Sequence, residues 1–169
     1  MNKLSRILIL LFVIFTCVGC DQATKRVAET HLRTSAPISY LNNTVRLEYA
    51  ENPGAFLSLG AGLSEDAQHW IFTIMVTLIL GGFLLFAFLY LHNLRLATLI
   101  ALALYIGGGL GNLIDRLFNN GVVVDFMNVG VGSLRTGIFN VADMAIMAAV
   151  AILLITQFPK QFSTQKIEH

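Results

Sequence analysis

Long apolar stretches set the strongest limit on what this chain can fold into. Residues 70–91 contain no charged side chain, and residues 5–22, 94–113 and 141–158 are predominantly apolar. A helix of about 20 residues crosses the hydrocarbon core of a bilayer. We therefore predict an all-α integral membrane protein with four transmembrane helices, at about 5–22, 70–91, 94–113 and 141–158.

The composition agrees with a membrane protein. Apolar residues make up 56% of the chain and charged residues only 12%, whereas a soluble domain is roughly 45–50% apolar. We expect a single membrane domain over residues 1–169. The formal net charge of +1 gives no electrostatic basis for binding nucleic acid.

The distribution of basic residues predicts the orientation. Five basic residues lie at the two ends and in the short link between the second and third spans: Lys3, Arg6, Arg95, Lys160 and Lys166. The two predicted outer loops, residues 23–69 and 114–140, and their flanks hold six basic residues against nine acids. Cytoplasmic segments are enriched in Lys and Arg, so we expect both termini in the cytoplasm and both loops outside.

The outer loops contain strand-like segments. Residues 45–49 alternate strictly between apolar and charged side chains, residues 122–126 are also strand-like, and a turn signal follows at residues 51–54. Such alternation is typical of a half-exposed strand. We predict a small β-sheet region on the outer membrane surface.

Asp125 and Asp143 are the most informative single residues, because each follows an apolar run near the end of the chain. A carboxylate in or near hydrocarbon is costly and usually has a function. Two alternatives remain open at this point. Asp143 could complement the amino end of the fourth helix, and Asp125 could be an exposed loop residue.

Two further motifs have structural interpretations. Cys17 and Cys20 form a C-x-x-C pair, but zinc needs four ligands and no second pair exists. Gly107 and Gly111 have the small-x-x-x-small spacing that lets two helices approach closely. No G-x-G-x-x-G nucleotide loop accompanies them.

Two charged pairs lie near the ends of the first and third spans. Asp21 and Lys25 are one helical turn apart and can form an i,i+4 ion pair. Asp115 and Arg116 end the third span in a similar manner. Either pair could be only a solvated helix end.

Five blocks in this order carry a family resemblance. They are Asp21-Gln-Ala-Thr-Lys25, Asn52-Pro-Gly-Ala-Phe56, Gly108-Gly-Leu-Gly-Asn-Leu-Ile-Asp-Arg116, Val123-Val-Asp-Phe126 and Phe139-Asn-Val-Ala-Asp143. Over nearly its whole length the chain resembles the lipoprotein signal peptidases, the type II signal peptidases of bacteria. The resemblance implies a membrane aspartic endopeptidase that cleaves a prolipoprotein before its diacylglyceryl-modified cysteine.

The resemblance also implies which residues form the site. Asp125 and Asp143 match the catalytic pair. Residues matching the positions that bind substrate or support the site are Asp21, Lys25, Asn52, Gly54, Asn112, Arg116 and Asn140. One departure concerns the shape of the substrate groove, since Gly54-Ala55 runs straight into Phe56, where the family usually has a second alanine.

The resemblance further implies diacylglyceryl-prolipoprotein substrates, surrounding membrane lipid, no nucleic acid, and no metal or cofactor. We expect a monomeric, multi-pass protein of the bacterial inner membrane with its active site at the periplasmic face. Independently, two close carboxylates in a low-dielectric site cannot both ionise easily, so one keeps a proton while the other acts as a base.

Two other classes of function are alternatives. A small proton-coupled carrier would also use two intramembrane acids, although such acids usually lie near the bilayer midplane. A lipid-modified membrane scaffold would use Cys20 as its anchor, because the segment before it resembles a lipoprotein signal peptide.

Overall fold

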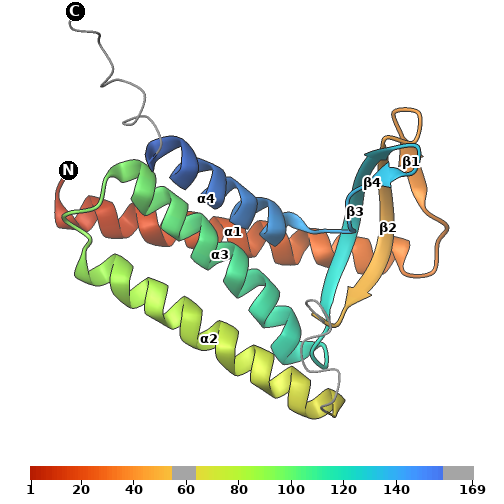
Figure 1. The fold of residues 1–169 in the computed structure, drawn as a ribbon, viewed down its shortest axis with the longest axis horizontal. Coiled ribbons are helices and arrows are strands. Elements are labelled where there is room, and N and C mark those ends of the chain that lie inside the picture. Colours follow the sequence, from red (N-terminus) through yellow and green to blue (C-terminus); the bar gives the residue numbers. More distant parts are fainter. Residues whose placement is uncertain (55–63, 158–169) are drawn as a thin grey trace, which may run out of the picture.

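The molecule consists of a helical bundle with a small sheet at one end. The computed structural model describes residues 1–54 and 64–157. Within them the helices are α1 (Lys3–Leu32), α2 (Glu65–Leu89), α3 (Leu96–Phe118) and α4 (Val141–Gln157), and the strands are β1 (Ile38–Tyr40), β2 (Val45–Asn52), β3 (Val123–Val131) and β4 (Leu134–Arg135). The helices form a bundle, and the sheet lies across one end of it (Figure 1).

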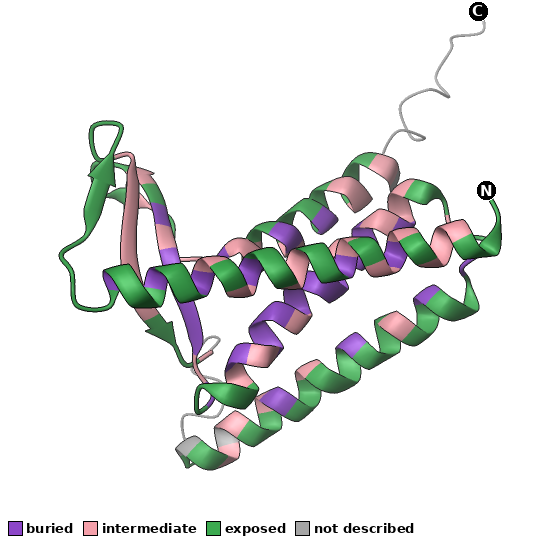
Figure 2. Cartoon of the chain, turned by 180° about the vertical axis from the view of Figure 1, so that it is seen from behind, coloured by how far each residue is buried: buried purple, intermediate pink, exposed green. Residues whose placement is uncertain are grey.

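Helix α3 is the centre of the bundle. It packs against α1, α2 and α4, and it is the most extensively buried helix, whereas α1 and α2 expose much of their surface (Figure 2). Large apolar side chains such as Phe12, Phe15 and Leu78 are exposed on α1 and α2. An apolar outer surface is what a lipid environment requires of a helical bundle.

Three helices in the described part of the chain are long and apolar enough to cross a membrane: Lys3–Leu32, His69–Leu89 and Leu96–Phe118. The apolar stretch of α4, Val141–Thr156, is shorter. The structure thus confirms a helical membrane protein with a small sheet, while the fourth span stays a prediction. The last predicted residue of that span, Phe158, lies outside the described residues.

Helix α1 is longer than the predicted span. The outer loop is expected to begin at residue 23, and α1 continues to Leu32, so residues 23–32 of that loop are helical. The extension has a buried stripe at Asp21, Lys25, Ala28 and Leu32, which is the spacing of one helix face. Ala28 and Leu32 pack against Phe126 of the sheet, whereas Asp21 and Lys25 contact α3 and the start of α4.

The sheet is antiparallel throughout, with strand order β1-β2-β3-β4. Both strand-like segments found in the sequence are part of it: residues 45–49 lie within β2, and residues 123–126 of the segment 122–126 begin β3. Their pairing aligns Asn52 with Val123 and Ala50 with Asp125. Because alternate residues share a face, the side chains of Asn52 and Asp125 lie on the same side of the sheet.

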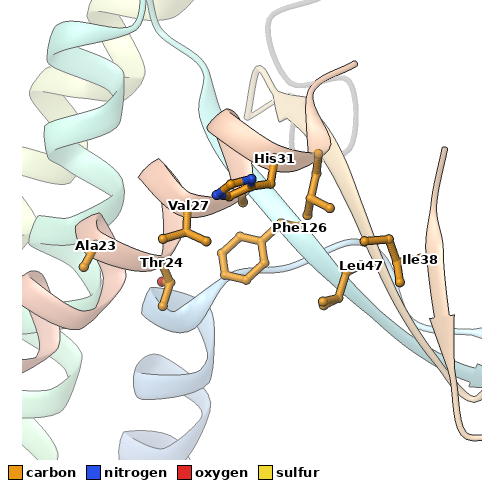
Figure 3. A pocket seen from close by; sticks show the side chains of 9 residues that line it. Ala23, Thr24, Val27, His31, Ile38, Leu47 and Phe126 are labelled. Carbon is orange, nitrogen blue, oxygen red and sulfur yellow. The ribbon is translucent and has the colours of Figure 1, made fainter. Parts of the chain in front are cut away.

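A small apolar cluster fixes β3 to the α1 extension. Phe126 packs with Ala28 and Leu32. Beside this contact lies a cavity of about 380 Å³, whose lining includes Val27, His31 and Phe126 (Figure 3). The residue next to Asp125 is therefore anchored to a helix that crosses the whole bundle.

Close helix contacts explain the glycines of α3. A Cβ at Gly107 would lie 2.7 Å from Cys17 Cβ, and a Cβ at Gly111 would lie 2.6 Å from Asp21 Oδ2. The predicted tight-packing role of this pair is confirmed, and its partner is α1. Real Cβ atoms do not come this close, so any larger side chain must push α1 and α3 apart.

We predict that Gly111→Ala lowers the free energy of unfolding by about 1–3 kcal/mol, because the added methyl overpacks the contact with Asp21. Gly82→Ala is the matched control, since a Cβ at Gly82 in α2 meets nothing within 4 Å. Chemical unfolding in detergent micelles measures both variants. Equal stability of the two would contradict the close contact.

Candidate active site

Asp125 lies in β3 and is almost completely buried, with 2% of its surface exposed. Asn52 Nδ2 donates a hydrogen bond to its Oδ2 (3.0 Å), and Asn140 Nδ2 donates one to its Oδ1 (2.7 Å). Both oxygens therefore accept from neutral amides. The alternative that Asp125 is an exposed loop residue is wrong.

Asp143 lies in the first turn of α4. Its Oδ2 accepts a hydrogen bond from the backbone N–H of Asn140 (3.1 Å), and Asn140 Oδ1 accepts one from the backbone N–H of Asp143 (2.9 Å). This reciprocal pair has the geometry of a capping box. Asp143 therefore does complement the amino end of the fourth helix, as one alternative held, but only its Oδ2 takes part in this contact. The other, Oδ1, accepts from Asn112 Nδ2 (2.9 Å).

Asn140 connects the two aspartates. It is fully buried, and while its backbone and Oδ1 bind Asp143, its Nδ2 donates to Asp125 and to Asn112 Oδ1 (3.0 Å). Asn112 in turn donates to Asp143. The structure therefore brings both predicted catalytic carboxylates and the three predicted asparagines, Asn52, Asn112 and Asn140, into one hydrogen-bonded network.

A buried ion cluster lies beside this network. Lys25 Nζ contacts Asp21 Oδ2 (2.8 Å) and Asp115 Oδ2 (2.9 Å), and it donates a hydrogen bond to Asn112 Oδ1 (2.9 Å). An ammonium has three donors, so Lys25 uses all of them. The exposed fractions of Asp21, Lys25 and Asp115 are 0%, 4% and 3%. The predicted Asp21–Lys25 pair exists, and it is buried rather than solvated.

Gly54 and Arg116 meet at the end of β2. Gly54 has a φ of 74°, and a Cβ there would lie 3.1 Å from Arg116 Nη2. Asn52 Oδ1 accepts from the backbone N–H of Gly54 (2.9 Å), and Arg116 Nη1 donates to the carbonyl of Asn112 (3.3 Å). Gly54 is therefore a close-approach position. The departure at Ala55 and Phe56 lies outside the described residues.

Asp115 and Gln22 belong to the site, although the sequence analysis did not assign them to it. Gln22 Nε2 donates to Asp115 Oδ1 (2.8 Å) and to the carbonyl of Gly111 (3.1 Å). The sequence suggested Arg116 as the companion of Asp115, but adjacent helix residues do not face each other. The available signal was that Lys25 and Asp115 each follow shortly after the end of a predicted span.

Burial governs the ionisation of Asp125. Desolvation raises the pKa of its carboxyl above the ordinary value. The hydrogen bond from Asn52 lowers the pKa, the negative charge of Asp143 raises it, and Asn140 and Lys25 lower it, with a net upward shift. A raised pKa is what a carboxyl pair that shares one proton requires.

No group of three or more His, Cys, Asp or Glu side chains that could hold a metal ion occurs within residues 1–54 and 64–157. Cys17 and Cys20 are free thiols. The described side chains around the two aspartates are carboxylates, amides and the basic groups of Lys25 and Arg116.

A family model and curated relatives match most of the chain. The model described as signal peptidase (SPase) II matches residues 13–159. Lipoprotein signal peptidases from Syntrophus aciditrophicus and Xylella fastidiosa are 34% and 35% identical, over 83% and 92% of this chain and 86% and 92% of their own lengths. The Leifsonia xyli subsp. xyli relative is 35% identical over 88% of this chain, which spans 66% of that longer protein.

Two solved structures of bacterial membrane enzymes share the fold. One, determined by the in meso method at 1.9 Å resolution, superposes with a TM-score of 0.70 and 26% sequence identity, covering 92% of this chain and 94% of its own. The other, at 2.3 Å resolution, has a TM-score of 0.67 and the same identity.

We predict that Lys25→Met destabilises the protein by about 3–5 kcal/mol, because it leaves the buried Asp21 and Asp115 carboxylates without their cation. Arg33→Met is the control. Its ion pairs with Glu29 and Glu51 are roughly half exposed, and such pairs contribute about 0–1 kcal/mol. Unfolding in detergent measures both, and a similar small loss in the two variants would contradict the buried cluster.

Proposed function

The chain belongs to the signal peptidase II family and is therefore a bacterial membrane protease that removes signal peptides from prolipoproteins; we propose that it does so as an aspartic endopeptidase with Asp125 and Asp143 as its catalytic dyad. One observation carries this proposal. Carboxylates from β3 and α4 contact the same asparagine, Asn140, at the end of the bundle where the sheet lies.

In the proposed reaction the dyad holds a single proton. The ionised carboxylate takes a proton from a water molecule, and the oxygen of that water attacks the scissile carbonyl carbon. The protonated carboxyl donates a hydrogen bond to the developing oxyanion, and the dyad then returns a proton to the leaving amine. Asn52, Asn112 and Asn140 keep the carboxylates in place, because their amides donate to three of the four carboxylate oxygens.

We further propose that the cleaved bond precedes a diacylglyceryl-modified cysteine. A cavity of about 460 Å³ lies beside Asp143, and its walls are largely apolar, formed by residues 136–139 together with Met144 and Met147. Met144 and Met147 are more than half exposed on the outside of α4. Acyl chains could therefore stay in apolar surroundings while the peptide bond reaches the polar network.

The arrangement of the helices supports a location for the site. The N-terminus and the end of α4 lie at the end of the bundle opposite the sheet (Figure 1). With the basic residues of the termini in the cytoplasm, the site lies at the periplasmic face of the inner membrane. We propose that the enzyme works there as a monomer in contact with membrane lipid. A proton-coupled carrier is not favoured, because the family consists of signal peptidases.

We predict that Asp125→Asn and Asp143→Asn each lower the turnover of a diacylated prolipoprotein by several orders of magnitude, because the members of a catalytic unit depend on each other. Asp66→Asn, which changes an exposed acid at the start of α2, is the control and should keep wild-type turnover. Conversion of the precursor in detergent or membranes is measured. Near wild-type turnover of either dyad variant would refute the assignment.

The pH dependence should be bell-shaped. Turnover falls at low pH as the ionised carboxylate takes up a proton, and it falls at high pH as the dyad loses its shared proton. Since burial raises the pKa of Asp125, the alkaline limb lies above the ordinary carboxyl range. Measuring kcat of the purified enzyme against pH tests this. An alkaline limb inside the ordinary carboxyl range would contradict the desolvated dyad.

A further inference from the structure

The two carboxylates of the buried ion cluster each accept a hydrogen bond from a backbone N–H next to the proposed dyad. Asp115 Oδ2 accepts a hydrogen bond from the backbone N–H of Val124 (3.0 Å), and Asp21 Oδ1 accepts one from the backbone N–H of Ala142 (2.9 Å). Val124 immediately precedes Asp125, and Ala142 immediately precedes Asp143. Each carboxylate of the ion cluster therefore binds the peptide N–H just before one catalytic aspartate.

Lys25 links these two hydrogen-bonded carboxylates into one unit. Its ammonium contacts both Asp21 Oδ2 and Asp115 Oδ2, so the distance between the two carboxylates is fixed by their common cation. The same ammonium donates to Asn112, whose amide donates to Asp143. The unit therefore spans from β3 to α4 through α1 and α3.

A second connection joins β3 to the start of α4. Phe139 exchanges backbone hydrogen bonds with Met127 and accepts one from the N–H of Phe126, and β4 pairs with the end of β3. A charged hydrogen bond is stronger and shorter than a neutral one. The hydrogen bonds from the backbone of Val124 and Ala142 to the Asp115 and Asp21 carboxylates are therefore well suited to fix the separation of Asp125 and Asp143.

We propose that Asp21, Lys25 and Asp115 are positioning residues which set the spacing of the catalytic carboxylates through the backbone of Val124 and Ala142. This proposal rests on the dyad proposed above. None of the three residues is proposed to touch the reacting atoms. Asp115, which the family resemblance did not assign, is as important in it as Asp21.

Asp115→Ala tests the proposal, with Asp115→Asn as the conservative variant. The alanine loses the acceptor for Val124 N–H, while asparagine keeps a side-chain oxygen that can accept it. A misplacement of reacting groups by about 1 Å costs on the order of 100-fold in rate. We expect kcat of Asp115→Ala to fall by about 10- to 100-fold with an unchanged KM for the precursor, and Asp115→Asn to recover a large part of the loss.

Glu29→Ala is the matched control. Glu29 is an exposed acid on the same helix as Asp21, and its partner is Arg33. Removing it takes one negative charge from the same region without touching either backbone segment. Its kcat should equal that of the wild type. All rates are measured below the unfolding temperature of each variant, per folded protein, so that lost stability is not counted as lost turnover.

The pH profile separates positioning from a change in charge. Among the described residues the charged groups around the dyad are Asp21 and Lys25 of α1 and Asp115 and Arg116 of α3, while β2 contributes the neutral Asn52. Loss of the Asp115 charge alone moves both limbs of the profile to lower pH. Wider spacing weakens the coupling between the two carboxylates, so the limbs move toward each other.

Converging limbs with a lower kcat and rescue by Asp115→Asn would support the proposal. An unchanged kcat in Asp115→Ala, or equal losses in the alanine and asparagine variants, would overturn it. If Asp115→Ala does not fold, the kcat of Asp115→Asn decides: a value near that of the wild type supports the proposal, and a loss of about 10-fold or more overturns it. These failures are distinct from failure of the dyad itself, which would leave Asp125→Asn or Asp143→Asn active.

Discussion

The structure depends on one constraint, which is that charges removed from water must be fully paired. Two carboxylates and an ammonium at Asp21, Lys25 and Asp115 are nearly inaccessible to solvent, and such burial is tolerated only when every donor and acceptor has a partner. No buried side-chain nitrogen or oxygen in the described residues lacks a hydrogen bond. Gly107 and Gly111 of α3 follow from this constraint, because they let α1 approach closely enough to place Asp21 against α3.

The proposed dyad is held by a different kind of interaction. Its carboxylates accept hydrogen bonds from the neutral amides of Asn52, Asn112 and Asn140, while the lysine binds the carboxylates one step farther away. An ammonium in direct contact would favour the doubly ionised state and lower both carboxyl pKa values. Amide donors hold the same geometry at a smaller electrostatic effect, so the pair can keep its proton. The proposed reaction therefore requires that neutral amides contact the catalytic carboxylates and that the Lys25 ammonium bind other carboxylates nearby.

The apolar segments and the family motifs predicted most of this arrangement. Helices α2 and α3, the strands β2 and β3, and the grouping of Asp125, Asp143, Asn112 and Asn140 correspond to what the sequence indicated. The extension of α1 was not predicted, because hydropathy drops after Cys20. Its buried positions Lys25, Ala28 and Leu32 have helical spacing, but contact with α3 and the sheet is what buries them, and spacing alone does not reveal those contacts. Asp115 was missed because its partner lies 90 residues earlier in the chain, and spacing cannot reveal such a contact.

The bond between Asp21 and Ala142 joins positions 121 residues apart, and this separation has a consequence for synthesis. Membrane proteins are made from the amino end, so α1 enters the bilayer long before α4 leaves the ribosome. Until then Asp21 has no backbone donor from the last helix, and Asp143 does not yet exist in the membrane. A nascent chain therefore lacks one member of the proposed dyad. The proposed site is complete only when the final helix has joined the bundle.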